Sequence, residues 1–230
     1  MKLYPLLFLN EGQVFANQAY NQGLVLIKIT HDGEHFLILL NKNQIKDKAT
    51  GELKESGQGI IYGGLQYSEN KESGNIQTKS ADAIQGYGPL LYQAVMYLNR
   101  SKWLESHESL SKYSYKVWNN MYKFSEQGIY KRKYIGNIGY SRYECANKLL
   151  DMGKVLSEEE RETEEAFLKL LKSLNVKPEE VGCFWAYKKI SHEPEIALML
   201  KEGKKLLKEE LNGDENKIVS WFRTVKLRAD

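Results

Sequence analysis

The segment 75–99 constrains the fold most, because an extended pattern changes there into a helical one across two glycines and a proline. "NIQTKSADAI" (75–84) is typical of a short strand or extended segment. The apolar residues after Pro89 recur at helical spacing, at Leu90, Leu91, Ala94, Val95 and Leu98. The segment between them, "AIQGYGP" (83–89), is called the elbow. It is either a plain turn or a place where main-chain N–H groups at a helix start bind a phosphate.

Strand-like runs precede the elbow. "GLVLIKIT" (23–30) and "EHFLILL" (34–40) are separated by His-Asp-Gly, which predicts an antiparallel hairpin. The polar segment 41–57 has room for one helical turn and a loop. "QGIIYGGLQYS" (58–68) is a further strand candidate, in which Gly63 and Gly64 indicate a bulge or a close backbone approach.

After the elbow the pattern is mainly helical. A helix is expected at 106–124, capped by Ser106 or Ser109, and the glycines of 128–140 indicate irregular structure. Further helices are expected at 141–154, 157–174 and 192–211, with a short strand at 182–190. We therefore predict an α+β fold with a mixed, largely antiparallel sheet and flanking helices. Residues 1–140 form the core, the strand at 182–190 completes its sheet, and residues 141–230 form a helical C-terminal extension.

Charge and composition narrow the function classes. The chain has 33 basic and 30 acidic residues, a net charge of +3, which argues against a nucleic-acid partner but does not oppose an anionic ligand. "YKRKY" (130–134) keeps a nucleic-acid interpretation open, although a solvated loop explains it more simply. Cys145 and Cys183 have no partners at metal-ligand spacing, so no metal site is expected.

The N-terminal "MKLYPLLFLNEG" has a short apolar patch interrupted by Pro5 and makes a poor signal peptide. The sequence has no apolar run of the roughly 20 residues that a membrane helix needs. We therefore expect a cytoplasmic protein without a membrane partner. The helix at 192–211 can bury its leucines within the chain or across a homodimer.

Three segments carry a resemblance to a known family: "AIQGYGPLLYQAVMYLN" (83–99), "SLSKYSYKVWNNMY" (109–122) and "CFWAYKK" (183–189). They resemble a group of mostly phage-encoded proteins of the GNAT (N-acyltransferase) superfamily. In that superfamily, antiparallel strands precede a [Q/R]xxGx[G/A] turn that holds the pyrophosphate of CoA and opens the central helix. The resemblance implies a GNAT-like fold and acetyl-CoA or a related acyl-CoA as cofactor. It implies main-chain donors at Gln85, Gly86, Tyr87, Gly88 and Leu90.

The resemblance further implies acyl transfer to an amine by direct attack in a ternary complex, with a host or viral macromolecule or a small molecule as acceptor. Tyr122 would then protonate or stabilise the leaving thiolate. The general base stays open among Glu11, Glu34, His35 and His107. Ala83 stands where the superfamily has Gln or Arg. An alternative function is therefore a non-catalytic GNAT-like module that binds or inhibits a host protein.

Overall fold

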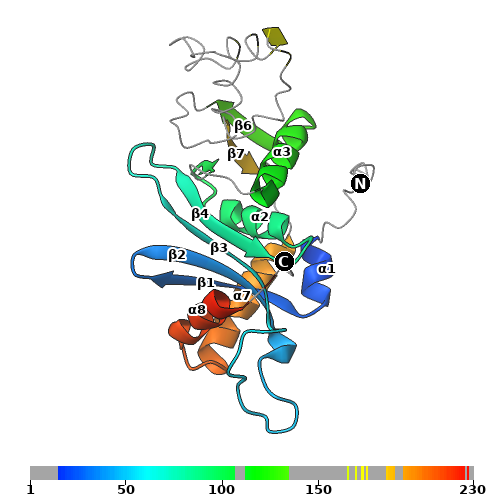
Figure 1. The fold of residues 1–230 in the computed structure, drawn as a ribbon, viewed down its shortest axis with the longest axis vertical. Coiled ribbons are helices and arrows are strands. Elements are labelled where there is room, and N and C mark those ends of the chain that lie inside the picture. The colour runs from blue at the N-terminus through cyan, green and yellow to red at the C-terminus, as the bar shows by residue number, and fades with distance from the viewer. Residues whose placement is uncertain are drawn as a thin grey trace. The chain divides into compact units, whose positions relative to one another are not determined.

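The computed structural model describes residues 15–106, 112–134, 165, 169, 172, 173, 175, 185–189, 194–225 and 227 of the 230-residue chain. The elements follow one another as α1 (Ala16–Asn21), β1 (Leu24–His31), β2 (Glu34–Asn41), η1 (Lys42–Gln44), β3 (Ile61–Glu69), β4 (Ile76–Ala83), α2 (Gly88–Leu98), β5 (Leu104–Glu105), α3 (Lys112–Glu126), β6 (Tyr130–Tyr134), β7 (Trp185–Lys189), α7 (Pro194–Glu209) and α8 (Glu215–Thr224) (Figure 1).

The strands form a seven-stranded, mostly antiparallel sheet in the order β1-β2-β3-β4-β5-β7-β6. The β4–β5 pair is parallel, whereas β1–β2, β5–β7 and β6–β7 are antiparallel. A parallel neighbour needs a crossover connection, and the elbow with α2 supplies it between β4 and β5. The expected mixed α+β class with a largely antiparallel sheet is confirmed.

The chain divides into two compact units. The first consists of Met1–Gln66, Ala81–Val95 and Glu193–Asp230, and the second of Tyr67–Ser80 and Met96–His192. Each is described by itself. No helix within the described residues is both long enough and apolar enough to cross a bilayer.

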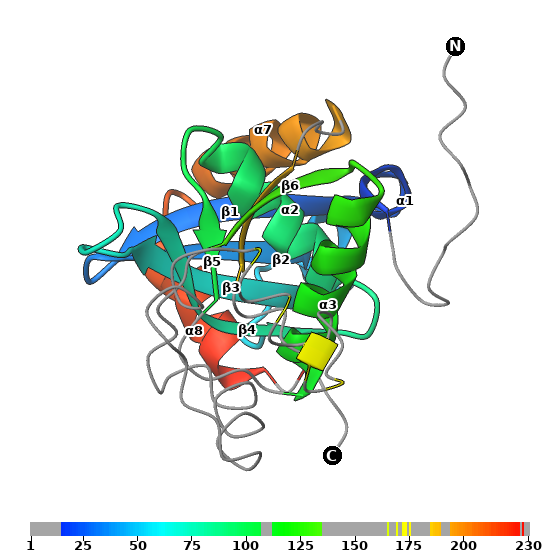
Figure 2. The ribbon, with the colours of Figure 1, turned by 90° about the horizontal axis from the view of Figure 1, so that it is seen from above.

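In the first unit, β1 and β2 form the predicted hairpin, with pairs running from Leu24↔Asn41 to His31↔Glu34. Asp32 and Gly33 have φ values of 53° and 78°, as a two-residue type I′ turn requires. Helix α7 runs along β1 (Figure 2) and confirms the helix expected at 192–211. A cluster of buried side chains from these elements and α8 includes Val25, Ile27, Phe36, Ile38, Leu206, Ile218 and Trp221.

The paired glycines of β3 confirm the expected close approach. A Cβ on Gly63 would lie 2.8 Å from the Cβ of Ala83, and a Cβ on Gly64 would lie 2.5 Å from the Phe222 ring. A real Cβ has almost no contacts this short, so either substitution would force its neighbours apart. The absent side chains therefore let β4 and α8 pack directly on β3.

The second unit corrects one prediction. Residues 128–140 were expected to be irregular, but Tyr130–Tyr134 form strand β6, paired antiparallel with β7. The alternation of this segment explains the strand: Tyr130 and Arg132 face inward, whereas Lys131 and Lys133 are exposed. Gly128, with φ 74°, precedes the strand.

Some of the other expected helices and strands lie within the described residues, and some lie outside them. The strand expected at 182–190 is β7. Helix α3 begins at Lys112, so Ser106 lies outside it, and Ser109 lies outside the described residues. The helices expected at 141–154 and 157–174 also lie outside the described residues, apart from isolated positions. Three short or C-terminal elements, α1, β5 and α8, were not predicted.

Candidate functional site

The elbow begins where β4 ends, and two successive turns lead into α2. The Ile84 N–H donates to the Tyr62 carbonyl at 2.9 Å, in the neighbouring strand β3. The Tyr87 N–H then donates to the Ile84 carbonyl at 3.1 Å, closing a four-residue turn. Gly86, the third residue of that turn, has φ 92°, the left-handed conformation that a type II turn requires at this position. A side chain at residue 86 would strain the turn.

Three main-chain donors of the elbow stay available. The Tyr87 N–H is used within the turn, Pro89 has no N–H, and the Leu90 N–H donates to the Tyr87 carbonyl at 3.2 Å. The N–H groups of Gln85, Gly86 and Gly88 find no acceptor among the described residues. These donors lie at the start of α2, where the helix dipole favours an anion.

The space in front of α2 is open. A Cβ on Gly88 would meet no atom within 4 Å, and Gly88 does not have a positive φ. The first turn of α2 contains no acidic residue to neutralise the dipole. The start of the helix therefore has room for a ligand and carries no competing carboxylate.

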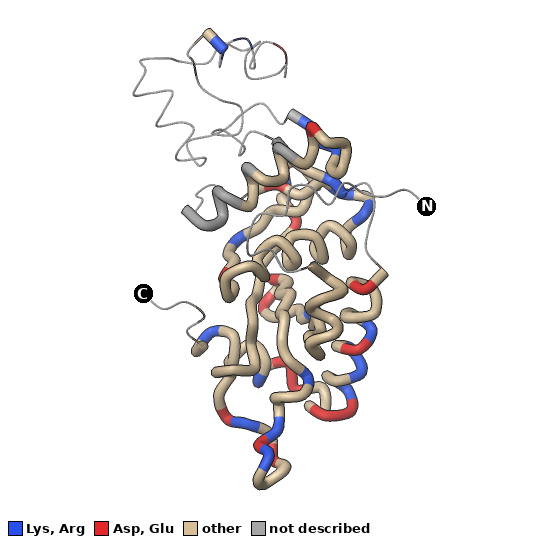
Figure 3. The backbone as a smooth tube through the Cα atoms, turned by 90° about the vertical axis from the view of Figure 1, so that its right-hand side faces the viewer, with Lys and Arg blue, Asp and Glu red and all other residues tan. Residues whose placement is uncertain are grey.

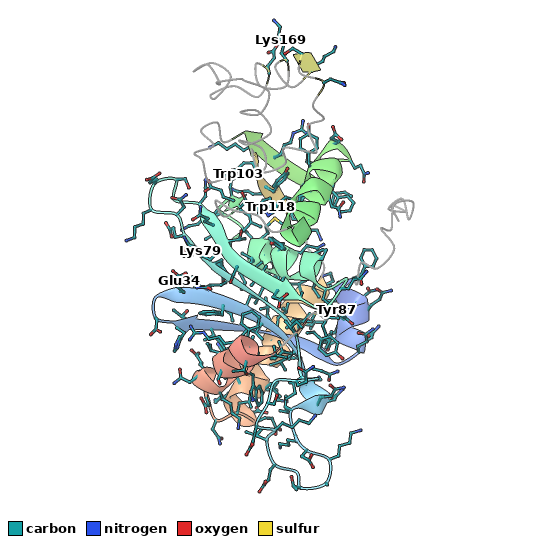
Figure 4. The ribbon with its side chains drawn as sticks, in the orientation of Figure 1. Glu34, Lys79, Tyr87, Trp103, Trp118 and Lys169 are labelled. Atoms are coloured by element: carbon teal, nitrogen blue, oxygen red, sulfur yellow. The ribbon has the colours of Figure 1, made fainter. Side chains whose placement is uncertain are left out.

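Tyr87 anchors the elbow from the inside. Its hydroxyl donates to Oε1 of Gln22, the C-cap of α1, at 2.8 Å, and its ring meets the Tyr62 ring edge-on at 5.3 Å. Tyr87 is labelled in Figure 4. Burial, followed by the nearby Tyr62, raises the pKa of Tyr87, so the phenol stays neutral. Tyr87 and Leu90, both expected among the donors, thus shape the turn with their N–H groups rather than leaving them free.

Tyr122, the expected acid, lies on α3 in the second unit, whereas the elbow belongs to the first. Its side chain is 2% exposed, and the guanidinium carbon of Arg132 lies 4.5 Å from its ring centroid. Arg132 also donates to Ser125 Oγ at 3.1 Å, and that hydroxyl donates to the Tyr122 carbonyl at 2.6 Å. The three residues hold α3 and β6 together.

Of the four candidates for the general base, two lie within the described residues and two lie outside them. Glu11 and His107 lie outside the described residues, whereas Glu34 and His35 begin β2 in the first unit. His35 Nδ1 lies 3.0 Å from Thr30 Oγ1. Burial first, then Lys28, lowers the pKa of His35, whereas Glu34 raises it. Oε2 of Glu34 is buried without a hydrogen-bond partner among the described residues.

Two supporting residues were missed in the sequence. Gln22 follows a helix too short to predict, and Arg132 was assigned to an irregular segment; the Tyr-Lys-Arg-Lys-Tyr alternation would have placed it on a strand. Among the described residues no group of three or more His, Cys, Asp or Glu side chains is arranged to hold a metal ion. No protein family, characterised protein or solved structure matches this chain.

Proposed function

We propose that the protein is an acyl-CoA-dependent N-acyltransferase of GNAT-like architecture and that the elbow holds the pyrophosphate of CoA. The observation that carries this proposal is the set of three unused N–H groups, on Gln85, Gly86 and Gly88, beside open space at the start of α2. Main-chain donors and a helix dipole are the usual means by which proteins bind phosphate without a basic side chain.

The order of elements supports the same proposal. Antiparallel strands precede the elbow, the elbow opens a helix, and a later strand carries Tyr187 and Lys188. This is the sequence of features in the GNAT-like proteins that the chain resembles. The parallel β4–β5 pair, joined by α2, places the elbow at the carboxyl end of β4. Ligands of sheets with such crossovers commonly bind at strand carboxyl ends.

In the proposed reaction, a neutral acceptor amine attacks the thioester carbonyl carbon. The new C–N bond forms, the C–S bond breaks, the thiolate takes the Tyr122 hydroxyl proton, and the proton that the amine loses passes through solvent to the Tyr122 phenolate and restores the hydroxyl. Arg132 suits Tyr122 to this role, because a positive charge 4.5 Å from the ring stabilises the phenolate that remains. The products are an amide and free CoA.

Ala83 favours the second candidate, a non-catalytic module of the same fold. Its methyl group points toward the position that a Gly63 side chain would occupy, and it has no polar atom to donate to a phosphate. A module of this kind would bind a host protein and have no need of CoA. CoA binding in the absence of any partner therefore separates the two candidates.

The test is calorimetric titration of the full chain with CoA and with pantetheine, which lacks the pyrophosphate. The acyltransferase should bind CoA at micromolar concentration and bind pantetheine far more weakly. Acetyl-CoA turnover with a panel of amines is then followed by thiol release, and Tyr122→Phe should abolish turnover while CoA binding persists. If millimolar CoA leaves the protein unbound, the acyltransferase proposal is wrong.

A further inference from the structure

A strip of lysines lies on one face of the β6–β7 pair in the second unit. Lys131 on β6 is directly opposite Lys188 on β7, and Lys133 follows Lys131 on the same face. The name lysine strip denotes these three residues. The opposite face of the pair packs on α3, through Tyr187 against Trp118 at 5.7 Å and Tyr130 against Phe124 at 6.0 Å. The lysine strip and these aromatic contacts therefore lie on opposite faces of the pair.

Like charges placed directly opposite each other across two strands destabilise the pair. Lys131 and Lys133 are exposed, and neither has an ion-pair partner among the described residues. Lys188 Nζ is fixed by the Ser101 carbonyl at 2.7 Å, which supplies a dipole but no negative charge. An anion bound across the strip would relieve the repulsion.

The second unit as a whole, residues 67–80 and 96–192, has 19 basic and 15 acidic residues, and ten of the acidic ones lie in residues 135–184. Residues 67–80, 96–106, 112–134 and 185–189 contain four acidic residues, Glu69, Glu72, Glu105 and Glu126. The same residues contain twelve basic ones: Lys71, Lys79, Arg100, Lys102, Lys112, Lys116, Lys123, Lys131, Arg132, Lys133, Lys188 and Lys189. Two of the four carboxylates are occupied, since Glu69 pairs with Lys102 and Glu105 is 3% exposed and accepts from three neutral side chains. Figure 3 shows in blue the lysines and arginines whose placement the structure describes.

Protection of a sheet edge does not explain the whole strip. Lysines on an edge strand prevent pairing with another chain, and this accounts for Lys131 and Lys133 on β6. Lys188, however, lies on β7, which has β5 on one side and β6 on the other. An interior strand has no free edge to protect, so this lysine needs a different reason.

An aromatic ring lies beside the strip. Lys188 Nζ is 4.9 Å from the centroid of the Trp103 ring, and Trp103 is half-buried. Trp103 is labelled in Figure 4. Proteins that bind single-stranded nucleic acid combine a row of cations along the phosphate backbone with aromatic rings that stack on bases. An acidic polypeptide would use the cations but gain nothing comparable from the ring.

The geometry points to a binding surface for single-stranded nucleic acid, made by Lys131, Lys133 and Lys188 with Trp103. The phosphates lie along the lysine strip, and a base reaches the indole ring. This surface is independent of the elbow and of the proposed acyl transfer. It also gives "YKRKY" a role that the mild net charge of the whole chain had argued against.

The test is fluorescence anisotropy of a labelled oligonucleotide of about 20 nucleotides with the full chain, at salt concentrations from about 50 to 200 mM. The variant Lys131→Gln/Lys133→Gln removes two charges and keeps the aliphatic stems. Lys201→Gln/Lys204→Gln is the matched control, because both residues are exposed on α7 in the first unit. Thermal melts establish that both variants fold.

Each phosphate contact on a single strand contributes about 0.7 to the slope of log affinity against log salt. The wild type should therefore give a slope near −2, and the strip variant should reduce its magnitude by about 1.4 and weaken binding at low salt by at least about tenfold. The control should bind within about twofold of the wild type. Trp103→Phe should lose most of the tryptophan quenching that binding produces, since it removes the stacked indole.

Three outcomes would overturn the proposal. The first is no oligonucleotide binding at the lowest salt. The second is an equal loss of affinity in the control, which would show general charge attraction. The third is equally tight, strip-dependent binding of poly-glutamate with no change in tryptophan fluorescence, which would identify an acidic protein as the partner instead.

Discussion

Gly88→Glu distinguishes a loss of ligand binding from a loss of folding. We expect it to lower the affinity for CoA and to keep or raise the free energy of unfolding. The substitution places a carboxylate at the first residue of α2, beside the three unused N–H groups. Apart from its chain neighbours, a Cβ at this position meets no atom within 4 Å, and the φ of Gly88 is not positive, although Pro89 restricts a side chain at the residue before it. Gly88→Gln is the matched control, with the same size and no charge.

The stability change follows from the position in the helix. Replacing the first residue of α2 restricts the unfolded chain and gains up to about 1 kcal/mol, less the cost of a side chain before Pro89, and a carboxylate in the first turn gains a further ~0.3–1 kcal/mol from the dipole. Gly88→Glu should therefore leave the free energy of unfolding unchanged or raise it by about 1–2 kcal/mol. For a protein of this size each kcal/mol raises Tm by about 2–4 °C. Gly88→Gln should gain only the contribution from replacing glycine, because its side chain carries no charge.

The binding change has the opposite sign. A carboxylate about 6 Å from a phosphate charge, at an effective dielectric constant near 20, repels it by about 3 kcal/mol, and salt reduces this toward about 1 kcal/mol. CoA affinity should fall by roughly 5- to 150-fold in Gly88→Glu. Gly88→Gln should lose much less, since its bulk lies in open space and its amide can donate to phosphate.

Calorimetric titration with CoA and thermal unfolding of the same preparations provide both measurements. A variant that binds CoA weakly because it is misfolded would have a lower Tm. If the elbow binds phosphate, Gly88→Glu should bind CoA more weakly and have an equal or higher Tm. If Gly88→Glu binds CoA as tightly as Gly88→Gln does, no phosphate lies at the start of α2. In that case the elbow is a strand-to-helix turn only.

Three further predictions concern stability, each measured by chemical denaturation. Glu105→Gln should lower the free energy of unfolding by about 1–3 kcal/mol. The buried carboxylate accepts from Asn70, Ser73 and Asn75, and an amide would turn a donor toward at least one of them. An unchanged free energy of unfolding would mean that these hydrogen bonds do not hold the segment 70–75. Gly203→Ala should lower the free energy of unfolding by at least about 1–3 kcal/mol, although alanine has the better helix propensity. The alanine Cβ would lie 2.1 Å from the Leu26 carbonyl oxygen. A gain in stability would refute this packing. The lowered pKa of His35 means that the unfolded chain binds the proton more readily, so this contribution to stability is present above pH 6.5 and is lost as the pH falls through the folded pKa. His35→Gln should reduce that acid sensitivity, and an unchanged pH dependence would contradict it.

Local chemistry allowed much of the first unit to be predicted. Asp32 and Gly33 fix a two-residue turn because each adopts a positive φ, and the apolar runs on either side can only pair with each other. Gly63 and Gly64 predicted a close approach, but not which neighbours would fill the space; Ala83 and Phe222 do so from segments about 20 and 158 residues away. Tertiary packing determines which residues lie next to these glycines, and the spacing of residue types along the sequence does not reveal it.

For the elbow too, the local turn could be predicted from the sequence, whereas its contacts with distant residues could not. Gly86, Gly88 and Pro89 predicted a turn before a helix, and the turn needs only local hydrogen bonds. Which N–H groups remain free depends on the turn type, and the anchoring of Tyr87 depends on Gln22, 65 positions earlier in the chain. Sequence alone could therefore propose five donors but could not reduce them to three.

The net charge of the whole chain averages over its segments and does not locate a charged surface. The +3 of the whole sequence is too small to indicate a polyanion, and the second unit as a whole has 19 basic against 15 acidic residues. Electrostatic attraction falls off within about 8–10 Å at physiological salt, so a ligand responds to the charges near its own site and not to the total. The strand register provides the missing information, because it sets Lys131 against Lys188 on one face and turns a solvated "YKRKY" into a surface with a defined spacing.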